Sequence, residues 1–529
     1  MDPQIRAPLL DAAGREAAMR ERLESLLLVL AVGSSVAIGA KRVGVPYNVA
    51  LVIVGLLLVL TDVLPNAAMD PEMILIAFLP ILVFEGAFFA DADNLRRASR
   101  PILALAVPGV AISLLGTAAV ATFVLGLPFP IALLLGALLS ITDTVSVLLA
   151  FRSVRVPHRL AAIMEGESLF NDGTALVLVT LASHVVTSGR FDAVDTLRAL
   201  GLAMLGGAAL GGAFGAVGAV ILRRAPDHLT AILASAVLVF ATSLVAERLH
   251  ASPVIAVVVA GVYVGKAARH ALGPSHVMAM QGFWESAGFG LNVLIFLLVG
   301  MQIQARTLLA EAGSIVLALV ALHAGRAIAV YGCFGALRAG TREVIPMRWQ
   351  HVMVVGNIKG ALSMAAVLTL PSGFPYRDRL VTIVFGVTFV TLMTQALPFG
   401  RLLKLLRVTE AAADPSFEAA KMTLVAARRG QAELDDLLTA GLVSRREHAE
   451  RRAIFQRRVI DAEAALRDHQ REAARDHVVE VSLLNAEKAA VLDAARRGLI
   501  SQDTASAHAN EIDGALLKLS THGGGGGET

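Results

Sequence analysis

The feature that most constrains this chain is a series of apolar runs between residues 24 and 407. Thirteen of these runs can be counted, and short loops separate them. A helix of about 17 to 25 apolar residues is long enough to cross the hydrocarbon core of a bilayer. Of the 529 residues, 56% are hydrophobic and only 17% are charged, which excludes an ordinary soluble protein. The sequence therefore predicts an all-α membrane protein with about thirteen transmembrane helices.

The charge of the loops predicts the orientation of these helices. Loops after odd-numbered runs contain fifteen Lys and Arg residues, whereas loops after even-numbered runs contain five. Basic loops remain on the cytoplasmic side of a membrane. We therefore expect a multi-pass protein of the cell (inner or plasma) membrane, with its N-terminus outside and its C-terminus in the cytoplasm.

The distribution of charge also divides the chain into four segments. Residues 1–23 are polar and lack a small-residue cleavage pattern, so we interpret them as an extracytoplasmic tail rather than a signal peptide. Residues 24–407 form the predicted membrane domain. Residues 408–521 are rich in Glu, Arg and Ala, which predicts a cytosolic helical domain for regulation or dimerisation. Residues 522–529 are a glycine-rich end that we expect to be disordered.

Within the predicted cytosolic domain, a helix-stop pattern occurs twice. Gly441-Leu-Val-Ser444 and Gly498-Leu-Ile-Ser501 each place a helix-ending glycine before an N-capping serine. The repeat predicts two helical hairpins.

The stretch from Glu165 to Asp172 places three carboxylates inside a long apolar run. An ionisable side chain in the middle of a bilayer costs about 3 kcal/mol or more, so such residues are usually functional. At about 100° per residue, Glu165, Ser168 and Asp172 share one face of a helix. Glu167 and Asn171 share the neighbouring face. The first face offers a hydroxyl and a carboxylate to a small cation, and Glu167 requires a basic partner of its own.

Two of the predicted spans are interrupted by polar residues. Hydroxyl residues surround Asp143 in the fifth span, and Gly356-Asn-Ile-Lys359-Gly places a lysine between glycines in the twelfth. Unwound backbone is tolerated at membrane depth where it lines a cavity or is buried in protein. Two interrupted segments in corresponding halves indicate an inverted-repeat secondary transporter. The alternative for the fifth span is an intact helix whose hydroxyls bond to the preceding turn.

Opposite charges are expected to compensate one another within the membrane. Pairing most of the acids would leave a small net negative charge that attracts a cation, whereas the full set of unpaired charges would be prohibitive. For the acid of the third span, the alternative is a solvated position at the membrane interface. The acids are Glu85, Asp143, Glu165, Glu167 and Asp172, and the bases are Arg326 and Lys359.

These motifs together resemble the monovalent cation:proton antiporter-1 family, the NhaP and NHE type of sodium/proton exchangers. The resemblance covers about residues 24 to 405, with the motifs in the family's order. They are Phe84-Glu85, Thr142-Asp143, Glu167-Ser-Leu-Phe-Asn171-Asp172, Phe283-Trp284-Glu285 running to Gly300, Gly325-Arg326 and Lys359-Gly-Ala-Leu-Ser. The resemblance implies a homodimer with the NhaA-like fold, in which two broken helices cross and a core domain moves like an elevator against a dimerisation domain.

The resemblance also implies roles for individual residues. Asp172 would carry the exchanged ion, with Ser168, the backbone at Thr142 and Glu85 around it. Asn171 would donate a hydrogen bond to Asp143, and Glu167 would pair with Arg326.

Two positions depart from the family's pattern. Thr144 stands where the family usually has proline, and Lys359 stands where it usually has arginine. A buried lysine can release its proton, whereas arginine stays charged. This substitution therefore bears on the number of protons moved per cycle.

The predicted function is secondary antiport, in which one Na⁺ is exchanged for one H⁺ and both compete for Asp172. Because Asn171 holds no proton, the exchange is expected to be electroneutral. The expected partners are the bilayer, a second copy of the chain, Na⁺ (or K⁺ or Li⁺) and H⁺, with no cofactor and no nucleic acid.

Three alternatives remain open from the sequence. The same scaffold could exchange K⁺, or a mixture of Na⁺, K⁺ and Li⁺, because oxygen ligands alone do not fix ion size. Asp143 and Asp172 could form the dyad of an intramembrane aspartyl protease. A non-transporting sensor would be favoured by an apolar residue at a ligand position, and the sequence has none.

Overall fold

The predicted all-α class is confirmed over the part of the chain that the structure describes. The computed structural model describes residues 27–61, 74–143, 146–147, 151, 154, 156–303, 305–341, 343–409, 415–496, 508–509 and 512, and their regular structure is entirely helical. The chain divides into two compact units, Met1–Thr409 and Glu410–Thr529. The predicted tail 1–23, the glycine-rich end 522–529 and Thr144 lie outside the described residues.

The long apolar helices of the first unit establish a multi-pass membrane protein. Among the described residues, eight helices are long and apolar enough to cross a bilayer: Ser99–Leu125, His158–Ser188, Val194–Arg224, His228–Arg248, Pro253–Ala271, Pro274–Met301, Ala312–Thr341 and Arg377–Ala396. The shorter apolar helices Tyr47–Leu60, Ile76–Phe89 and Phe129–Leu138 coincide with three further predicted spans. Residues 27–43 are helical as well. The count of thirteen crossings stays a prediction.

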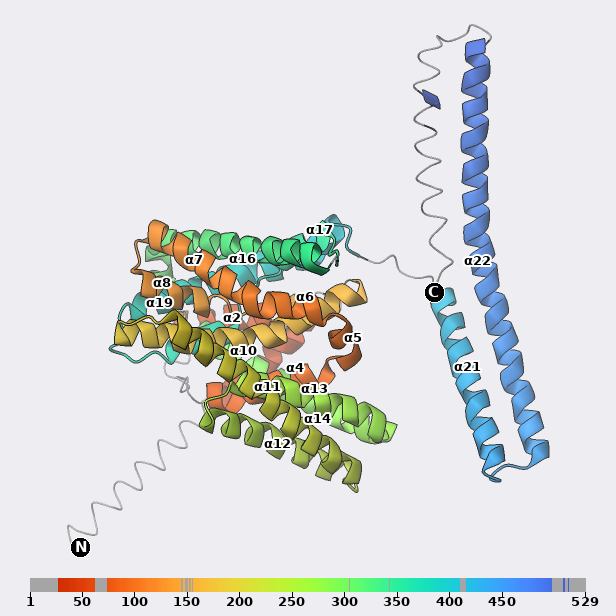
Figure 1. Ribbon diagram of the computed structural model, residues 1–529, viewed down its shortest axis with the longest axis horizontal. Coiled ribbons are helices and arrows are strands. Elements are labelled where there is room, and N and C mark those ends of the chain that lie inside the picture. Colours follow the sequence, from red (N-terminus) through yellow and green to blue (C-terminus); the bar gives the residue numbers. More distant parts are fainter. Residues whose placement is uncertain are drawn as a thin grey trace. The chain divides into compact units, whose positions relative to one another are not determined.

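Six helices, which we call the α11 group, pack chiefly on one another (Figure 1). They are α2 (Tyr47–Leu60), α4 (Leu79–Phe89), α11 (Ala193–Arg224), α12 (His228–Arg248), α13 (Pro253–Ala271) and α14 (Pro274–Met301). The π-helical turn η1 (Ile74–Phe78) leads into α4. A Cβ atom on Gly211 of α11 would collide with the carbonyl oxygen of Ala256 in α13, so glycine permits the close approach of these two helices.

A second set, the α16 group, contains most of the remaining helices of the first unit and lies on its upper side in Figure 1. It comprises α6 (Ser99–Ala104), η2 (Leu105–Gly109), α7 (Val110–Leu125), α8 (Phe129–Leu138), α10 (His158–Ser188), α15 (Ala305–Ala310), α16 (Ala312–Thr341), α17 (Met347–Val355), α18 (Ala361–Leu368), α19 (Arg377–Thr391) and η3 (Leu392–Ala396). The short helix α5 (Ala92–Arg97) connects α4 to α6, and α20 (Phe399–Leu405) follows η3. Helix α10 also contacts α11 and α13, so it lies at the boundary between the groups.

Both predicted interruptions are present, and they hydrogen-bond to each other. Helix α8 ends at Leu138, and residues 141–143 are not helical. Residues 357–360 separate α17 from α18 in the same way. The backbone N–H of Asp143 donates to the carbonyl of Ile358 at 2.8 Å, and the Ser363 hydroxyl donates to the carbonyl of Ile141 at 3.3 Å. These bonds satisfy backbone groups that two intact helices would have satisfied internally.

The second unit contains a helical hairpin built from α21 (Pro415–Thr439) and α22 (Arg445–Arg496). Gly441 adopts a left-handed conformation with φ of 71°, and the Ser444 hydroxyl accepts a hydrogen bond from the N–H of Glu447 at 3.2 Å. The first of the two predicted helix-stop patterns therefore lies between two helices, as expected. The second, at residues 498–501, lies outside the described residues. The ion pairs Arg428–Glu463 and Arg452–Asp435 and a hydrogen bond between His448 and Asp435 join the two helices.

Candidate ion-binding site

Helix α10 presents the acidic stretch on two faces, as its spacing predicts. Glu165 and Asp172 line a cavity. Glu167 and Asn171 are buried among neighbouring helices, with 4% and 1% of their surfaces exposed. The helix is continuous over its 31 residues from His158 to Ser188, so the two faces keep a fixed angle to each other.

Asp172, Thr142 and Ser168 meet beside the first interruption. Oδ1 of Asp172 accepts a hydrogen bond from the backbone N–H of Thr142 at 3.3 Å. The Thr142 Oγ1 and Ser168 Oγ atoms lie 3.0 Å apart. The N–H of Thr142 is available because the chain has left the helix, where this group would bond to a carbonyl four residues earlier. The arrangement places a carboxylate and two hydroxyl groups together, and oxygen atoms of this kind replace the hydration shell of an alkali cation.

Asp143, the second acid of this region, faces helix α2 instead. Nδ2 of Asn48 donates to Oδ2 of Asp143 at 3.4 Å and also to the hydroxyl of Ser146. The Ser146 hydroxyl in turn donates to the same carboxylate. Asn48 is fully buried, at 0% exposure. Sequence reasoning missed this residue, although a lone asparagine in an apolar span was a visible signal.

The expected hydrogen bond from Asn171 to Asp143 is wrong. Nδ2 of Asn171 donates to the carbonyl of Ser140 at 3.1 Å, and it lies 3.3 Å from Oε1 of Glu167 and 3.4 Å from Oγ1 of Thr142. The interruption frees the carbonyl of Ser140 opposite α10, and the Asp143 side chain turns toward α2. Asn171 therefore holds the unwound backbone rather than the acid.

The expected pair of Glu167 and Arg326 is present. Nη1 of Arg326 donates to Oε1 of Glu167 at 2.8 Å, and Nη2 donates to Oε2 at 3.0 Å. Each side chain is 5% exposed. Nε of Arg326 also donates to the carbonyl of Met353 in α17 at 3.2 Å. One guanidinium on α16 therefore joins α10 and α17 through a two-pronged contact that lysine could not reproduce.

Lys359 does not form the direct ion pair with an acid that the count of opposite charges suggested. Its Nζ donates to Oδ1 of Asn357 at 2.6 Å, and within the described part of the chain it forms no ion pair with a carboxylate. The backbone N–H of Lys359 donates to the hydroxyl of Thr391 at 3.2 Å. The lysine is fully buried, at 0% exposure. Its position in the short non-helical segment directs the ammonium to a neighbouring amide instead of across to α10.

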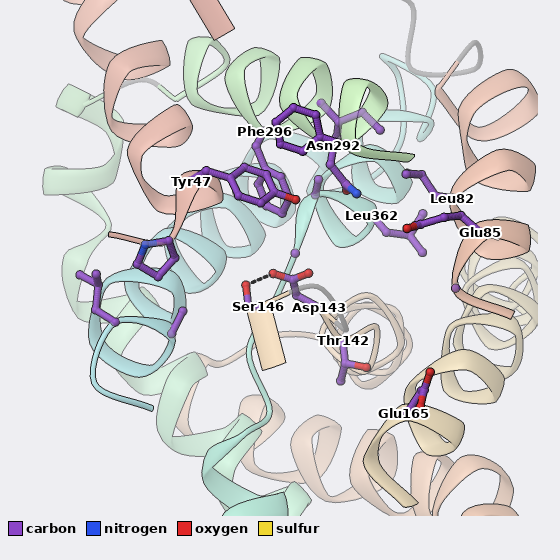
Figure 2. Close-up of a pocket in the computed structure, with 18 of the residues that line it drawn as sticks. Tyr47, Leu82, Glu85, Thr142, Asp143, Ser146, Glu165, Asn292, Phe296 and Leu362 are labelled. Carbon is purple, nitrogen blue, oxygen red and sulfur yellow. Dashed lines mark hydrogen bonds between the residues drawn. The ribbon is translucent and has the colours of Figure 1, made fainter. Parts of the chain in front are cut away.

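A cavity of about 1510 Å³ reaches the acidic residues. Its wall includes Asp172, Thr142, Asp143, Glu85 and Glu165. Figure 2 shows Asp143 and its bond to Ser146 near the centre of the view, with Glu85 and Glu165 entering from other sides. Ser168, Glu167, Asn171, Arg326 and Lys359 are not part of the wall. The structure therefore separates residues that face the cavity from residues that support them from behind.

Interrupted helices that bring a carboxylate, hydroxyls and free backbone groups to a cavity within an apolar bundle define a class of protein, the secondary membrane transporters. The comparisons with known proteins specify the family. Residues 26–405 match the model of the sodium/hydrogen exchanger family, transmembrane. The chain belongs to this family, whose members are transporters and not enzymes, and the hypothesis of an aspartyl protease is therefore wrong.

Individual relatives extend the match. The chain is 37% identical over 516 residues to the Na(+)/H(+) antiporter NhaS2 of Synechocystis, with 94% of each chain covered. It is 36% identical over 395 residues to the Na(+)/H(+) antiporter ApNhaP of Aphanothece halophytica, covering 73% of this chain and 75% of the relative. Its fold is similar to that of the sodium proton antiporter MjNhaP1 from Methanocaldococcus jannaschii, with a TM-score of 0.61 and 22% identity over 73% of this chain and 99% of the other.

Proposed function

We propose that this protein is a sodium/proton antiporter that exchanges one Na⁺ for one H⁺, with both ions competing for Asp172. The observation that carries the proposal is that Asp172 accepts the Thr142 N–H where both residues line a cavity, with the Ser168 hydroxyl 3.0 Å from the Thr142 hydroxyl directly behind the wall. Relatives that align with 94% and 73% of the chain are named Na(+)/H(+) antiporters, which supports the same activity here.

Competition at a single carboxylate is sufficient to couple the two ions. An ionised carboxylate is costly to bury unless a charge of opposite sign accompanies it. The transporter can therefore pass through its closed state when Asp172 holds either a proton or a cation. It cannot do so when the Asp172 carboxylate is ionised and holds neither. The cation is held by the Asp172 carboxylate with the Ser168 and Thr142 oxygens. Asn171 carries no proton, so one positive charge moves in each direction.

Lys359 determines whether the exchange stays electroneutral. One-for-one exchange requires the Lys359 ammonium, whose Nζ donates to Oδ1 of Asn357, to keep its proton throughout the cycle. A lysine that released its proton would add a second moving charge, and the exchange rate would then depend on the membrane potential.

We infer that alternating access occurs by movement of the α16 group against the α11 group, as in an elevator. Lys41, Arg401 and Lys404 line the large cavity. Loop charge assigns these residues to the cytoplasmic side, so the cavity opens toward the cytoplasm. A second cavity of about 540 Å³ includes Glu247 and Thr369, which the same topology assigns to the outer side. Movement of the α16 group would transfer Asp172 from the first cavity to the second.

The sequence pattern and the family membership also support a proposal for the topology and the assembly of the whole protein. It comprises thirteen crossings with inverted repeats, the N-terminus outside the cell membrane, and a homodimer. Residues 408–521 form a cytosolic domain for regulation or dimerisation.

Proteoliposomes containing a pH-sensitive dye test the proposal. Addition of Na⁺ to acid-loaded vesicles should release protons with wild-type protein and not with Asp172→Asn. Asp195→Asn removes an exposed carboxylate of α11 and serves as the matched control, with full exchange expected. Persistent Na⁺-driven proton release by Asp172→Asn would remove Asp172 from the mechanism.

The same assay identifies the ion. Responses to Na⁺, Li⁺ and K⁺ are compared with the full chain and with a chain lacking residues 408–529. A response to K⁺ that equals or exceeds the response to Na⁺ would replace the proposal with K⁺/H⁺ or mixed exchange on the same scaffold.

A further inference from the structure

His323 and Gln395 form a half-buried, hydrogen-bonded pair that the proposed exchange at Asp172 does not use. Nδ1 of His323, on α16, bonds to the carbonyl of Leu319 at 2.8 Å. Because a carbonyl can only accept, Nδ1 carries a hydrogen, and in the neutral ring Nε2 carries none. Nε2 accepts a hydrogen bond from the amide nitrogen of Gln395, in η3, at 2.7 Å. The contacts therefore leave Nε2 as the atom of the ring that can take up a proton.

The other end of the Gln395 amide has no competing bond. Its Oε1 atom is buried and has no hydrogen-bond partner within the described part of the chain. The amide can therefore rotate by half a turn and give up only its bond to His323. A proton on Nε2 would make that nitrogen a donor, and the rotated amide would present Oε1 as its acceptor. Hydrogen bonds to a charged donor are stronger than neutral ones, so the pair can hold the ring in either protonation state.

The pair lies behind the wall of the large cavity and beside the second interruption. Thr394 and Ala396, on either side of Gln395 in the chain, both line the cavity. Thr391 is four residues before Gln395, so the two lie on one side of the α19–η3 segment. The Thr391 hydroxyl accepts the backbone N–H of Lys359 at 3.2 Å. A change at the His323 ring therefore occurs close to groups that surround the proposed ion site.

Lys359 is the charged residue whose field acts on the His323 ring, and the same charge acts on Asp172. Helix α7 and η2, which pack on α16, contain no ionisable side chain. On α16 itself, Arg326 is paired with Glu167. The other charged or titratable residues of elements packed on α16 are Arg100 in α6, Arg306 in α15, Arg348 and His351 in α17, and Arg377, Asp378 and Arg379 at the start of α19.

We propose that His323 and Gln395 form a second proton-binding site, separate from Asp172, and that a proton there weakens the binding of the transported cation. A charged His323 adds positive charge on the side of Lys359, and a cation arriving at Asp172 is repelled by both. Linked binding is reciprocal, so a cation at Asp172 also disfavours the proton on His323. The effect on Na⁺ rests on the proposed antiport, whereas the binding of a proton by the pair does not.

The pH dependence of the half-saturating Na⁺ concentration in proteoliposomes tests the link. Competition with one proton at Asp172 raises this concentration by at most about tenfold for each unit by which the pH falls. With a second linked proton, the wild type should exceed that limit over the range in which His323 titrates. His323→Gln should stay within the limit. Gln395→Leu should move the steep region to lower pH, because the protonated ring loses its acceptor.

His351→Gln serves as the matched control. His351 is also a half-buried histidine of the same unit, and its Nδ1 lies 2.7 Å from the Tyr331 hydroxyl. Its removal should leave the steepness of the wild type unchanged. Loss of the steep region in His351→Gln as well would show a general effect of removing a histidine and would overturn the assignment to His323.

Nitrogen NMR of the histidine rings, recorded on the detergent-solubilised full chain, gives a measurement independent of transport. The His323 signal is identified by its absence from His323→Gln. Nε2 should change from bare to protonated as the pH is lowered from about 8 to about 5. A ring that stays neutral over this range, or a wild type that stays within the tenfold limit, would overturn the site. Absence of exchange in the wild type would instead overturn the proposed function, and the NMR titration would still decide whether the pair binds a proton.

Discussion

The buried pair of Glu167 and Arg326 provides the sharpest test of how this site is supported. Removal of one partner, as in Arg326→Gln or Glu167→Gln, leaves the other charge in a place where only about 5% of its side chain meets solvent. Breaking such a pair costs about 3–5 kcal/mol, whereas removing both charges costs far less. We therefore expect each single variant to be strongly destabilised and the double variant Glu167→Gln/Arg326→Gln to be more stable than either.

The secondary contacts refine this expectation. Arg326→Gln also loses the bond to the carbonyl of Met353, but Glu167 keeps its contact with Asn171 at 3.3 Å. Glu167→Gln retains one oxygen for Arg326 but leaves the guanidinium without a counter-ion. The coupling free energy of the double-mutant cycle should be at least about 1 kcal/mol.

Unfolding in detergent, followed through the fluorescence of Trp284 and Trp349, measures the three free-energy differences. Neither Glu167 nor Arg326 lines the cavity, so the double variant should also retain Na⁺-dependent proton exchange. Additive effects within about 0.5 kcal/mol would show that the pair contributes no mutual stabilisation and would refute the reasoning.

Three further predictions concern other elements. Asn48→Leu removes the hydrogen bonds from α2 to Asp143 and Ser146 beside the first interruption, so the cytoplasm-facing state should lose about 1.5 kcal/mol. This loss should appear as a roughly tenfold change in the ratio of internal to external half-saturating Na⁺. Gly211→Ala should lower the melting temperature, since overpacking costs about 1–3 kcal/mol, whereas Gly212→Ala, with nothing within 4 Å, should leave it unchanged or raise it. Hydrogen bonds from the backbone and hydroxyl of Thr230 lower the pKa of Asp227, the N-cap of α12, below its ordinary value of 3.8. The contribution of Asp227 to stability is thus present above pH 3.8 and is lost as the pH falls through the lower pKa of the folded state. The destabilisation caused by Asp227→Ala should therefore disappear at that lower pH. Asp227→Asn keeps the cap and should match the stability of the wild type above pH 3.8.

Local sequence predicted the parts of this fold that depend on local energetics. Apolar runs predicted the helices, and the hydroxyl cluster around Asp143 and the glycines around Lys359 predicted both interruptions, because these residues weaken the backbone bonds of a helix. The faces of α10 followed from helical geometry alone. The partner of Glu167 required the family resemblance, since 159 residues separate it from Arg326.

The errors share a physical cause. The side chains of Asn171 and Lys359 belong to, or face, unwound segments in which no fixed period sets their direction. Counting opposite charges suggested that Lys359 would meet a carboxylate, but the ammonium donates to the neighbouring amide of Asn357 instead. The partner of Asn48 could not be predicted, because nothing in the sequence indicates that α2 lies against the first interruption. Cavities depend on how whole groups of helices pack, which no local pattern records.

The bond from the Thr142 N–H to Asp172 is made by the main chain, and every residue except proline supplies that group. A substitution at this position therefore does not alter the N–H contact. A change of preferred ion during evolution requires substitutions at other ligand positions. The neighbouring hydroxyls are the adjustable part, because their number and reach vary with each substitution. Relatives adapted to different salts should accordingly differ at the hydroxyl positions while the peptide group beside the acid keeps its place.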